Sequence, residues 1–434
     1  MNPNSYEYWL PADRQKKYSG KGVTRSVPPS ATIRRVRARM HRVGITKVAE
    51  VTKLDRVGIP NFMTVRPHDL GPGISYYNGK GTTRADAHAG ALMEAVERHG
   101  GESCGYAVLT GCYADLQRRY ACVDPRDIHV PTAAEFDENT ELEWVAGFEL
   151  LKRRETLTPL NCVISPYEPR TTRAVFYTST NGLASGNTRL EALCHALCEV
   201  IERDASAVTM AKARIRPAVA DLLAEMGFNC AGDREHDAPP LISLRGLPRP
   251  SALLVGKLQR AGLKVYLRNL TSTAGIPTID CTIVERGPDG LCSAHGGTGT
   301  HPDARVALSR ALTEAAQSRV ALIQGGREDL PEVITSAAAY DPDAVFGARD
   351  TIGFDEIPSH ENLYVNKDVE FLLERMAQCD FEQIVAFDLT RPDVGIPVVR
   401  VVVPRSEAWT IFHLHTRRAA LGGRVLRELE PLAR

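Results

Sequence analysis

The sequence has no excess of charge of either sign, since Lys plus Arg and Asp plus Glu each number 53 among its 434 residues. Proteins that wrap nucleic acid are usually strongly basic, so this balance argues against that class. No uninterrupted apolar run approaches the roughly eighteen residues that span a membrane, and the N-terminal stretch MNPNSYEYWLPADRQKK lacks the apolar core of a signal peptide. We therefore expect a cytoplasmic protein with neither membrane nor nucleic-acid partners.

The ten cysteines include no C-x-x-C pair, and Cys194 and Cys198 lie one helical turn apart. That spacing is more typical of a packed core than of a zinc site. The familiar nucleotide signatures are also missing, because the sequence contains neither a G-x-x-x-x-G-K-[ST] loop nor a G-x-G-x-x-G fingerprint. If the protein uses a nucleotide, we expect an uncommon binding site.

Strand-like and helix-like segments alternate along the chain, and 43% of its residues are hydrophobic. This pattern predicts a mixed α/β fold in which helices pack on sheets. We divide the chain into an N-terminal segment, residues 1–70, and a main domain, residues 71–434. Within the main domain, a strand–helix–strand pattern predicts an α/β subdomain of the βαβ type at about residues 206–290.

Two local features accompany this division. The first thirty residues are polar and basic and are expected to form an irregular arm, after which Ser30 is a candidate cap for a helix. The tripeptide Gly-Ile-Pro occurs at residues 58–60, 275–277 and 395–397, each time before a β-rich run. Because glycine and proline mark turns, the repetition hints that several strands begin in the same way.

The most informative stretch runs from Asn187 to Asp204 and predicts a helix that Asn187 caps. At 100° per residue, Glu191, Glu199 and Glu202 fall on one stripe of this helix, with leucines on the opposite side. His195 lies on the same stripe. A solvated acidic face is the ordinary interpretation of a single stripe of this kind.

The acidic pattern recurs, which favours a functional interpretation. Glu94-x-x-Glu97-Arg98 repeats the arrangement of Glu199-x-x-Glu202-Arg203, and a third helix places Glu314 and Gln317 on one face. Carboxylate oxygens are ligands that Mg²⁺ prefers, and Mg²⁺ in proteins usually also binds substrate phosphates. Three similar helices therefore predict a shared magnesium site for a nucleoside triphosphate.

Glycine-bearing segments precede the three helices, at residues 71–81, 181–186 and 295–301. We interpret them as loops that direct backbone N–H groups and helix N-termini toward phosphate oxygens. Positive side chains that accompany the loops and helices would add charge for the phosphates; they are Lys80, Arg98, Arg203 and Arg310.

Three segments, in this order, resemble the ATP-binding motifs of the YcaO family: GKGTTRADAHAGALMEAVER, SGNTRLEALCHALCEVIERD and HPDARVALSRALTEAAQSR. The resemblance implies a YcaO-type fold with ATP and Mg²⁺ as cofactors. The metal contacts it implies are Glu94, Glu97, Glu191, Glu199, Glu202 and Glu314. The nucleotide contacts it implies are Arg25, Thr32, Lys80, Asn187, Glu191, Arg203 and Arg310, the first two from a weaker match.

This sequence departs from the family motifs at two positions. Gly90 stands where the family often has serine, and Arg310 stands where it often has glutamine. The first change removes a polar contact, and the second places a cation near the phosphates. The sequence assigns no residue as the catalytic acid or base.

Three further segments, GITKVAEVTKLDRVGIP, DEIPSHEN and FDLTRPDVGIPVVRVVVP, look most like the archaeal, TfuA-associated branch of the family. That branch thioamidates a glycine in the alpha subunit of methyl-coenzyme M reductase. The resemblance thus implies that subunit as substrate, a TfuA-like protein or another sulfide donor as partner, and a homodimer.

Three alternatives remain open at this point. One is an azoline-forming cyclodehydratase, which the absence of a Pro-x-Pro tail in the final residues EPLAR disfavours. Another is a regulatory protein that binds ATP without modifying a peptide. In the third, the acidic helices are simply solvated surface.

Overall fold

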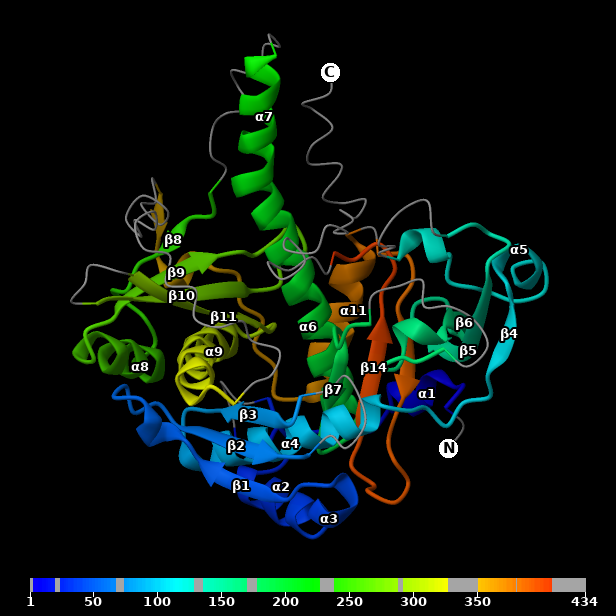
Figure 1. The fold of residues 1–434 in the computed structure, drawn as a ribbon, viewed down its shortest axis with the longest axis horizontal. Helices are drawn as coiled ribbons and strands as arrows, with labels where there is room; N and C mark the ends of the chain where they lie inside the picture. Colours follow the sequence, from blue (N-terminus) through cyan, green and yellow to red (C-terminus); the bar gives the residue numbers. More distant parts are fainter. Residues whose placement is uncertain are drawn as a thin grey trace.

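The computed structural model describes residues 3–19, 24–67, 74–128, 136–169, 178–226, 238–287, 292–326, 350–379 and 381–407, without the side chains of 214–219. These residues form three sheets with helices packed between and around them (Figure 1). The predicted mixed α/β fold is confirmed. No helix in these ranges is long and apolar enough to cross a membrane.

The first sheet has three antiparallel strands, in the order β1 (Lys47–Glu50), β2 (Asn61–Val65) and β3 (Tyr76–Lys80). The helix α4 (Arg84–Gly101) packs against β2 and β3, and α2 (Pro29–Arg37) packs against α4. The short helix α3 (Met40–Val43) lies nearby. The strands β2 and β3 flank the predicted boundary at residue 70 and are neighbours in one sheet.

The second sheet has five strands and one apolar core with the two helices α8 (Arg249–Arg260) and α9 (Ala304–Gln324). Its order is β11 (Cys292–Thr300), β10 (Thr278–Arg286), β9 (Lys264–Asn269), β8 (Leu241–Ile242) and β12 (Thr351–Ile352). The helix α9 lies between this sheet and β3 of the first sheet (Figure 1). The βαβ interpretation was wrong, because β8 and β9 flank α8 but pair antiparallel.

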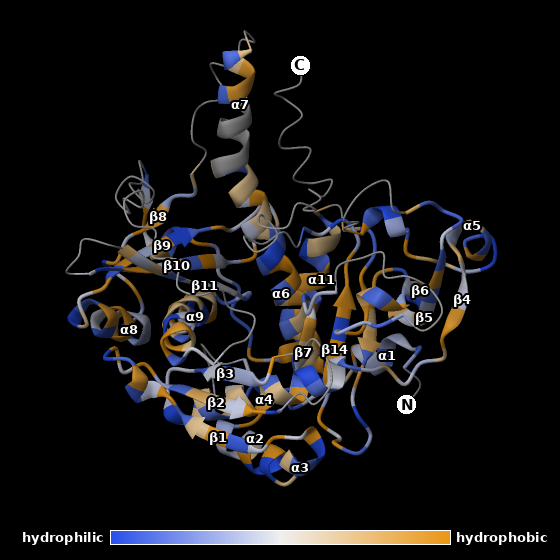
Figure 2. Cartoon of the chain, in the orientation of Figure 1, coloured by the Kyte–Doolittle hydropathy of each residue, from blue (hydrophilic) through white to orange (hydrophobic). Residues whose placement is uncertain are grey.

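The third sheet has six strands. Its order is β4 (Leu109–Cys112), β5 (Glu141–Glu149), β13 (Val385–Asp388), β14 (Val398–Val402) and β7 (Leu183–Ser185), with β6 (Arg154–Pro159) paired to β5. The strand β14 is buried throughout and is largely hydrophobic in Figure 2. One face of this sheet packs on the two helices α6 (Arg189–Met210) and α11 (Val365–Ala377).

The remaining helices are short, apart from one extension. From α6 the chain continues through a π-helical turn (Ala211–Ile215) into α7 (Arg216–Glu225), which projects away from the sheets (Figure 1). The other elements are α1 (Tyr6–Trp9), α5 (Tyr113–Leu116) and 3₁₀ turns at Thr52–Leu54, Pro125–Asp127, Leu160–Cys162 and Phe354–Glu356.

Glycine allows the acidic helices to lie directly on the strands before them. A Cβ atom on Gly79 would lie 1.9 Å from the backbone nitrogen of Ala91 in α4, and one on Gly297 would lie 2.2 Å from that of Ala315 in α9. Two of the predicted loops were therefore wrong in part, since β3 and β11 occupy most of residues 74–81 and 295–301. Gly79 and Gly297 thus allow close helix–strand packing, and residues 71–73 of the first predicted loop lie outside the described residues.

The three Gly-Ile-Pro tripeptides do begin strands, as the repetition hinted. They lead directly into β2, β10 and β14. The glycines 58, 275 and 395 have φ angles of 70°, 65° and 62°, which lie in the left-handed region that side chains disfavour. Each tripeptide is thus a tight turn whose proline sits just outside the ladder of hydrogen bonds.

The described residues among the first thirty, 3–19 and 24–30, are largely irregular outside α1, as expected, but buried contacts anchor them to the rest of the molecule, so they are not a free arm. Trp9 is buried against the third sheet and its helices, and the ammonium of Lys17 lies 2.6 Å from a carboxylate oxygen of Asp368. Ser30 is not a cap, because α2 begins at Pro29, whose fixed φ suits the first helical position.

Candidate functional site

The helices α4, α6 and α9 bring their predicted carboxylates within electrostatic range of one another. The charges that act on Glu97 of α4 include those of Glu94 and of Glu199 in α6. The charges that act on Glu202 of α6 include that of Glu314 in α9. Three helices far apart in the sequence therefore contribute to one acidic site, as their shared pattern predicted.

The two predicted carboxylates of α4, Glu94 and Glu97, differ in burial. Glu97 is buried and accepts a hydrogen bond of 2.9 Å from the backbone N–H of Ser185 in β7. Its burial, together with the charge of Glu94, raises its pKa well above the usual value. Glu94 pairs at 2.9 Å with Arg98 one turn later, so part of the charge is balanced within the helix.

The stripe on α6 is not a solvated surface, because Glu191 and Glu202 are buried and Glu199 is partly buried. Glu199 lies 3.7 Å from Arg203, and burial raises the pKa of its carboxyl group. Glu202 is buried, and its Oε2 atom has no hydrogen-bond partner among the described residues. Burial and the charge of Glu314 raise the pKa of Glu202 to about 7. An unpartnered buried carboxylate of this kind calls for a ligand.

Two of the positive charges of the site come from β3 and α9. Lys80, at the end of β3, forms an ion pair with Glu314. Although burial alone would raise the pKa of Glu314, the charges of Lys80, Arg203 and Arg310 lower it. Arg310 lies one turn before Glu314, and its Nε atom is buried without a hydrogen-bond partner in the described part of the chain. The site thus contains an unpaired donor as well as an unpaired acceptor.

The N-terminal segment closes the site over the start of α6. Thr188, rather than the predicted Asn187, caps α6, because its side chain accepts from the N–H of Glu191. Asn187 instead donates through its N–H and Nδ2 atoms to Glu191 Oε2, at 2.9 and 3.0 Å. Thr32 in α2 donates to Asn187 Oδ1 at 2.8 Å. Arg25 lies 3.7 Å from Glu191, so all four predicted residues of this region meet.

Two residues that the sequence analysis missed complete this contact. Ser26 donates to Glu191 through both its N–H and its hydroxyl group. Arg35 donates to the carbonyl oxygen of Asn187 at 2.7 Å. No motif marks either residue, and only the fold places them beside α6. Both oxygens of Glu191 are therefore already hydrogen-bonded, and its predicted role as a metal ligand stays a prediction.

Most of the chain matches a known protein family. Residues 78–407 match the model of the YcaO family, described as YcaO cyclodehydratase, ATP- and Mg²⁺-binding. The chain belongs to the YcaO family. Its cofactors are accordingly ATP and Mg²⁺, as the resemblance of the three motifs implied.

Individual YcaO relatives agree over nearly the whole chain. An uncharacterised protein of Methanothermobacter thermautotrophicus is 35% identical, covering 89% of this chain and 96% of the relative. A protein described as lying in the tfuA 3′ region of Rhizobium leguminosarum bv. trifolii is 29% identical, covering 90% and 91%. The solved structure of YcaO from Methanopyrus kandleri, bound with AMPPCP and Mg²⁺, is 26% identical with a TM-score of 0.68, covering 92% and 95%.

The residues of this YcaO protein suit Mg²⁺ and a triphosphate. Within the described ranges, no three carboxylates of the acidic helices have oxygens within 4.8 Å of one another. Mg²⁺ does not require such a cluster, since it usually keeps several waters and takes phosphate oxygens besides one or two carboxylates. The unpaired oxygen of Glu202 and the unpaired Nε of Arg310 offer an acceptor for the metal shell and a donor for a phosphate.

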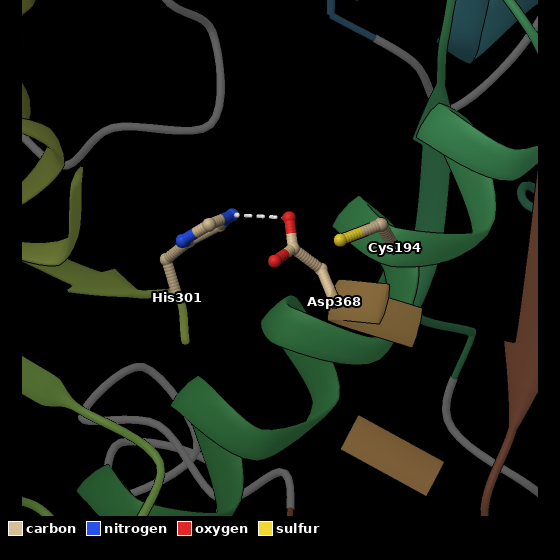
Figure 3. A group of neighbouring side chains, drawn as sticks. All are labelled: Cys194, His301 and Asp368. Carbon is tan, nitrogen blue, oxygen red and sulfur yellow. Dashed lines mark ion pairs between the residues drawn. The ribbon is translucent and has the colours of Figure 1, made fainter. Parts of the chain in front are cut away.

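A second cluster, formed by Cys194, His301 and Asp368, has the composition of a transition-metal site (Figure 3). Its His301 Nδ1 atom accepts a hydrogen bond of 2.9 Å from the backbone N–H of Asp303. Burial, followed by the charge of Lys17, holds the pKa of His301 at about 3. A neutral ring that accepts at Nδ1 carries its proton at Nε2, the atom that faces Asp368 at 3.6 Å.

This geometry favours a metal-free cluster. The protonated Nε2 atom of His301 has no lone pair for a metal, and Asp368 is already neutralised by Lys17. Adding a divalent cation and a thiolate of Cys194 to the Lys17–Asp368 pair would leave a net positive charge in a fully buried place. We therefore interpret the cluster as a structural ion pair that joins the N-terminal segment, α6 and α11 to the start of α9.

Proposed function

We propose that this YcaO protein uses ATP and Mg²⁺ to convert a glycine amide of a peptide backbone to a thioamide. The observation that carries the proposal is the set of carboxylates and cations on α4, α6, β3 and α9, which suits phosphoryl transfer. The choice of thioamidation is supported by the relative from the tfuA 3′ region, which aligns over 90% of this chain. It is also supported by the three segments that resemble the TfuA-associated branch.

The proposed reaction balances without a redox partner. Hydrosulfide adds to the amide carbon, and the resulting oxyanion takes the γ-phosphoryl group of ATP, releasing ADP. The carbon–oxygen bond then breaks as the C=S bond forms, and phosphate leaves with the amide oxygen. The proton of hydrosulfide ends on that phosphate. Activation is needed because an amide oxygen is a poor leaving group.

The side chains of the site would serve the phosphoryl transfer by position and charge. Bound Mg²⁺ supplies charge neutralisation on the triphosphate and on the developing oxyanion. Glu202 and Glu314 would bind Mg²⁺ directly or through its waters. The motifs imply four further metal contacts: Glu94, Glu97, Glu191 and Glu199. Lys80, Arg203 and Arg310 would bind phosphate oxygens, because they reach the carboxylates from three different elements. Arg25, Thr32 and Asn187 would position the nucleotide at the start of α6.

For the substrate and partners we propose the alpha subunit of methyl-coenzyme M reductase, a TfuA-like protein or another sulfide donor, and a second copy of the chain. The homodimer rests on the resemblance alone, and the cytoplasmic location rests on the sequence patterns described above. Sedimentation of the purified protein would test the dimer directly.

Mass spectrometry of a modified peptide tests the reaction. A glycine-containing peptide of the reductase alpha subunit is incubated with the protein, Mg²⁺, ATP and sulfide, with and without a TfuA-like protein. We expect an ATP-dependent mass gain equal to the exchange of oxygen for sulfur. Glu202→Gln serves as the inactive control. An unchanged peptide mass under all these conditions would refute the proposal.

An azoline-forming cyclodehydratase is the second candidate, because the description of the family names that activity. It would use the same activation of an amide oxygen, with a Cys, Ser or Thr side chain as the nucleophile in place of sulfide. The same spectra separate the two reactions, since ring formation lowers the peptide mass by one water. ATP that stays bound but unspent with every peptide would instead favour the regulatory alternative.

A further inference from the structure

His195 is the one member of the α6 stripe that carries no carboxylate. It lies one turn after Glu191 and one turn before Glu199, on the inner face of the helix. Its ring is partly exposed, whereas its Nδ1 atom is buried and has no hydrogen-bond partner in the described residues. His195 thus lies between two proposed metal ligands of the same helix, and its Nδ1 atom has no partner among the residues that the structure describes.

The largest charge effects on His195 come from three separate segments of the chain. They are, in order of effect, those of Arg310 in α9, Arg25 in the N-terminal segment and Lys80 in β3. These are three of the cations that we propose for the phosphates. The imidazole ring therefore lies within electrostatic range of three elements that we propose to hold the triphosphate.

The ring stays neutral in these surroundings. Burial, followed by the charges of Arg310 and Arg25, holds the pKa of His195 well below its usual value. A neutral imidazole offers one N–H donor and one lone pair. The phosphates are already matched by cations, so an uncharged group that both donates and accepts suits a different part of the reaction.

We propose that His195 contacts the peptide group that is being modified and holds its amide beside the γ-phosphate. A peptide group is uncharged and presents one N–H and one C=O, which matches the hydrogen-bonding capacity of a neutral imidazole. Because Nδ1 is buried, we assign the contact with the substrate to Nε2, the other polar atom of the ring. The inference rests on the proposed function in that a peptide is modified, but it holds for thioamide and azoline formation alike, since both attack the same amide carbon.

Substitutions of His195 separate this role from nucleotide binding. In His195→Ala, we expect the kcat of peptide-dependent phosphate release to fall about 100-fold, the size of effect seen when one hydrogen bond to a reacting group is removed. The affinity for Mg²⁺–AMPPCP should stay at the wild-type value. A Gln side chain places its amide nitrogen near the position of Nε2 and an Asn side chain places it near Nδ1, so His195→Gln should retain much more activity than His195→Asn.

A control variant and a second measurement accompany this test. His88→Gln replaces a partly buried histidine that stacks on Phe62 outside the acidic site, and it should behave as wild type. Binding of a fluorescent glycine-containing peptide in the presence of Mg²⁺–AMPPCP should weaken in His195→Ala, whatever product the wild type forms.

The possible outcomes distinguish the role of His195 from the proposed thioamidation. If wild type forms an azoline while His195→Ala loses peptide affinity, thioamidation fails and the role of His195 stands. An equal loss of nucleotide and peptide affinity in His195→Ala would overturn the inference. Wild-type peptide affinity and kcat in His195→Ala, or no binding of peptide by the wild-type protein, would overturn it as well.

Discussion

Replacing Glu202 by Gln should make the ligand-free protein more stable at pH 8 and at the same time abolish its binding of Mg²⁺–ATP. Glu202 is buried, and its Oε2 atom has no partner in the described part of the chain. Burial and the charge of Glu314 raise its pKa from 4.5 to about 7. The folded protein therefore favours the neutral carboxylic acid, and above about pH 7 the carboxylate forms at the expense of stability.

The sign and size follow from proton linkage. Because the folded state binds the proton more tightly than the unfolded state, ionisation of Glu202 lowers the free energy of unfolding as the pH rises from 4.5 through 7. The rise of this pKa from 4.5 to about 7 corresponds to about 3 kcal/mol, since a tenfold change in a proton affinity is worth about 1.36 kcal/mol. The Gln variant has no such loss, so its advantage should approach about 3 kcal/mol at pH 8 and shrink as the pH falls toward 4.5.

Denaturant unfolding with EDTA at pH 5 and pH 8, together with calorimetry of Mg²⁺–AMPPCP binding, measures both effects. Glu149→Gln is a matched control, since Glu149 is equally buried but accepts hydrogen bonds from the N–H groups of Leu151 and Ile384. That variant should lose about 2 kcal/mol and bind the nucleotide normally. A Glu202→Gln protein that is no more stable at pH 8, or that binds nucleotide with wild-type affinity, would refute the reasoning.

Three further predictions concern the supports of the site. Lys80→Met removes the partner of Glu314 and a proposed phosphate contact, so calorimetry should find Mg²⁺–AMPPCP bound about 10- to 100-fold more weakly. Lys17→Met leaves the buried carboxylate of Asp368 unpaired, and denaturant unfolding should show a loss of about 3–5 kcal/mol; an unchanged midpoint would contradict the buried ion pair. Gly297→Val drives a side chain into the backbone of α9, and a loss of about 3 kcal/mol together with weaker nucleotide binding is expected from unfolding and calorimetry.

The acidic face of α6 could be predicted from the sequence because helical periodicity is a local property. Glu191, Glu199 and Glu202 must share a face wherever the helix packs. The repetition of the pattern in α4 and α9 then indicated a common site. The buried amide contact of Glu97 with Ser185 shows why pairwise detail escaped, since it joins positions that only the fold brings together.

The glycine segments, in contrast, could not be predicted correctly from the local sequence. The sequence around Gly79 and Gly297 has the composition of a loop, and the helix that presses on each strand is absent from any local window. Ser26 and Arg35 were missed for a related reason, because their partner residues at the start of α6 lie more than 150 positions away in the chain. Glycine-rich composition therefore suggested loops at positions where packing between distant segments favours strands. The sequence around Ser26 and Arg35 contained no pattern that marked them as partners of α6.

The residues that close over α6 set a practical limit on how the protein can be shortened. The family match begins at residue 78, whereas the donors to Glu191 and Asn187 include Ser26, Thr32 and Arg35. A protein trimmed to the matching region would keep all the proposed metal ligands and yet expose the first turn of α6. Such a fragment would be inactive for a reason unrelated to its carboxylates, so assays of this protein should begin from the full chain.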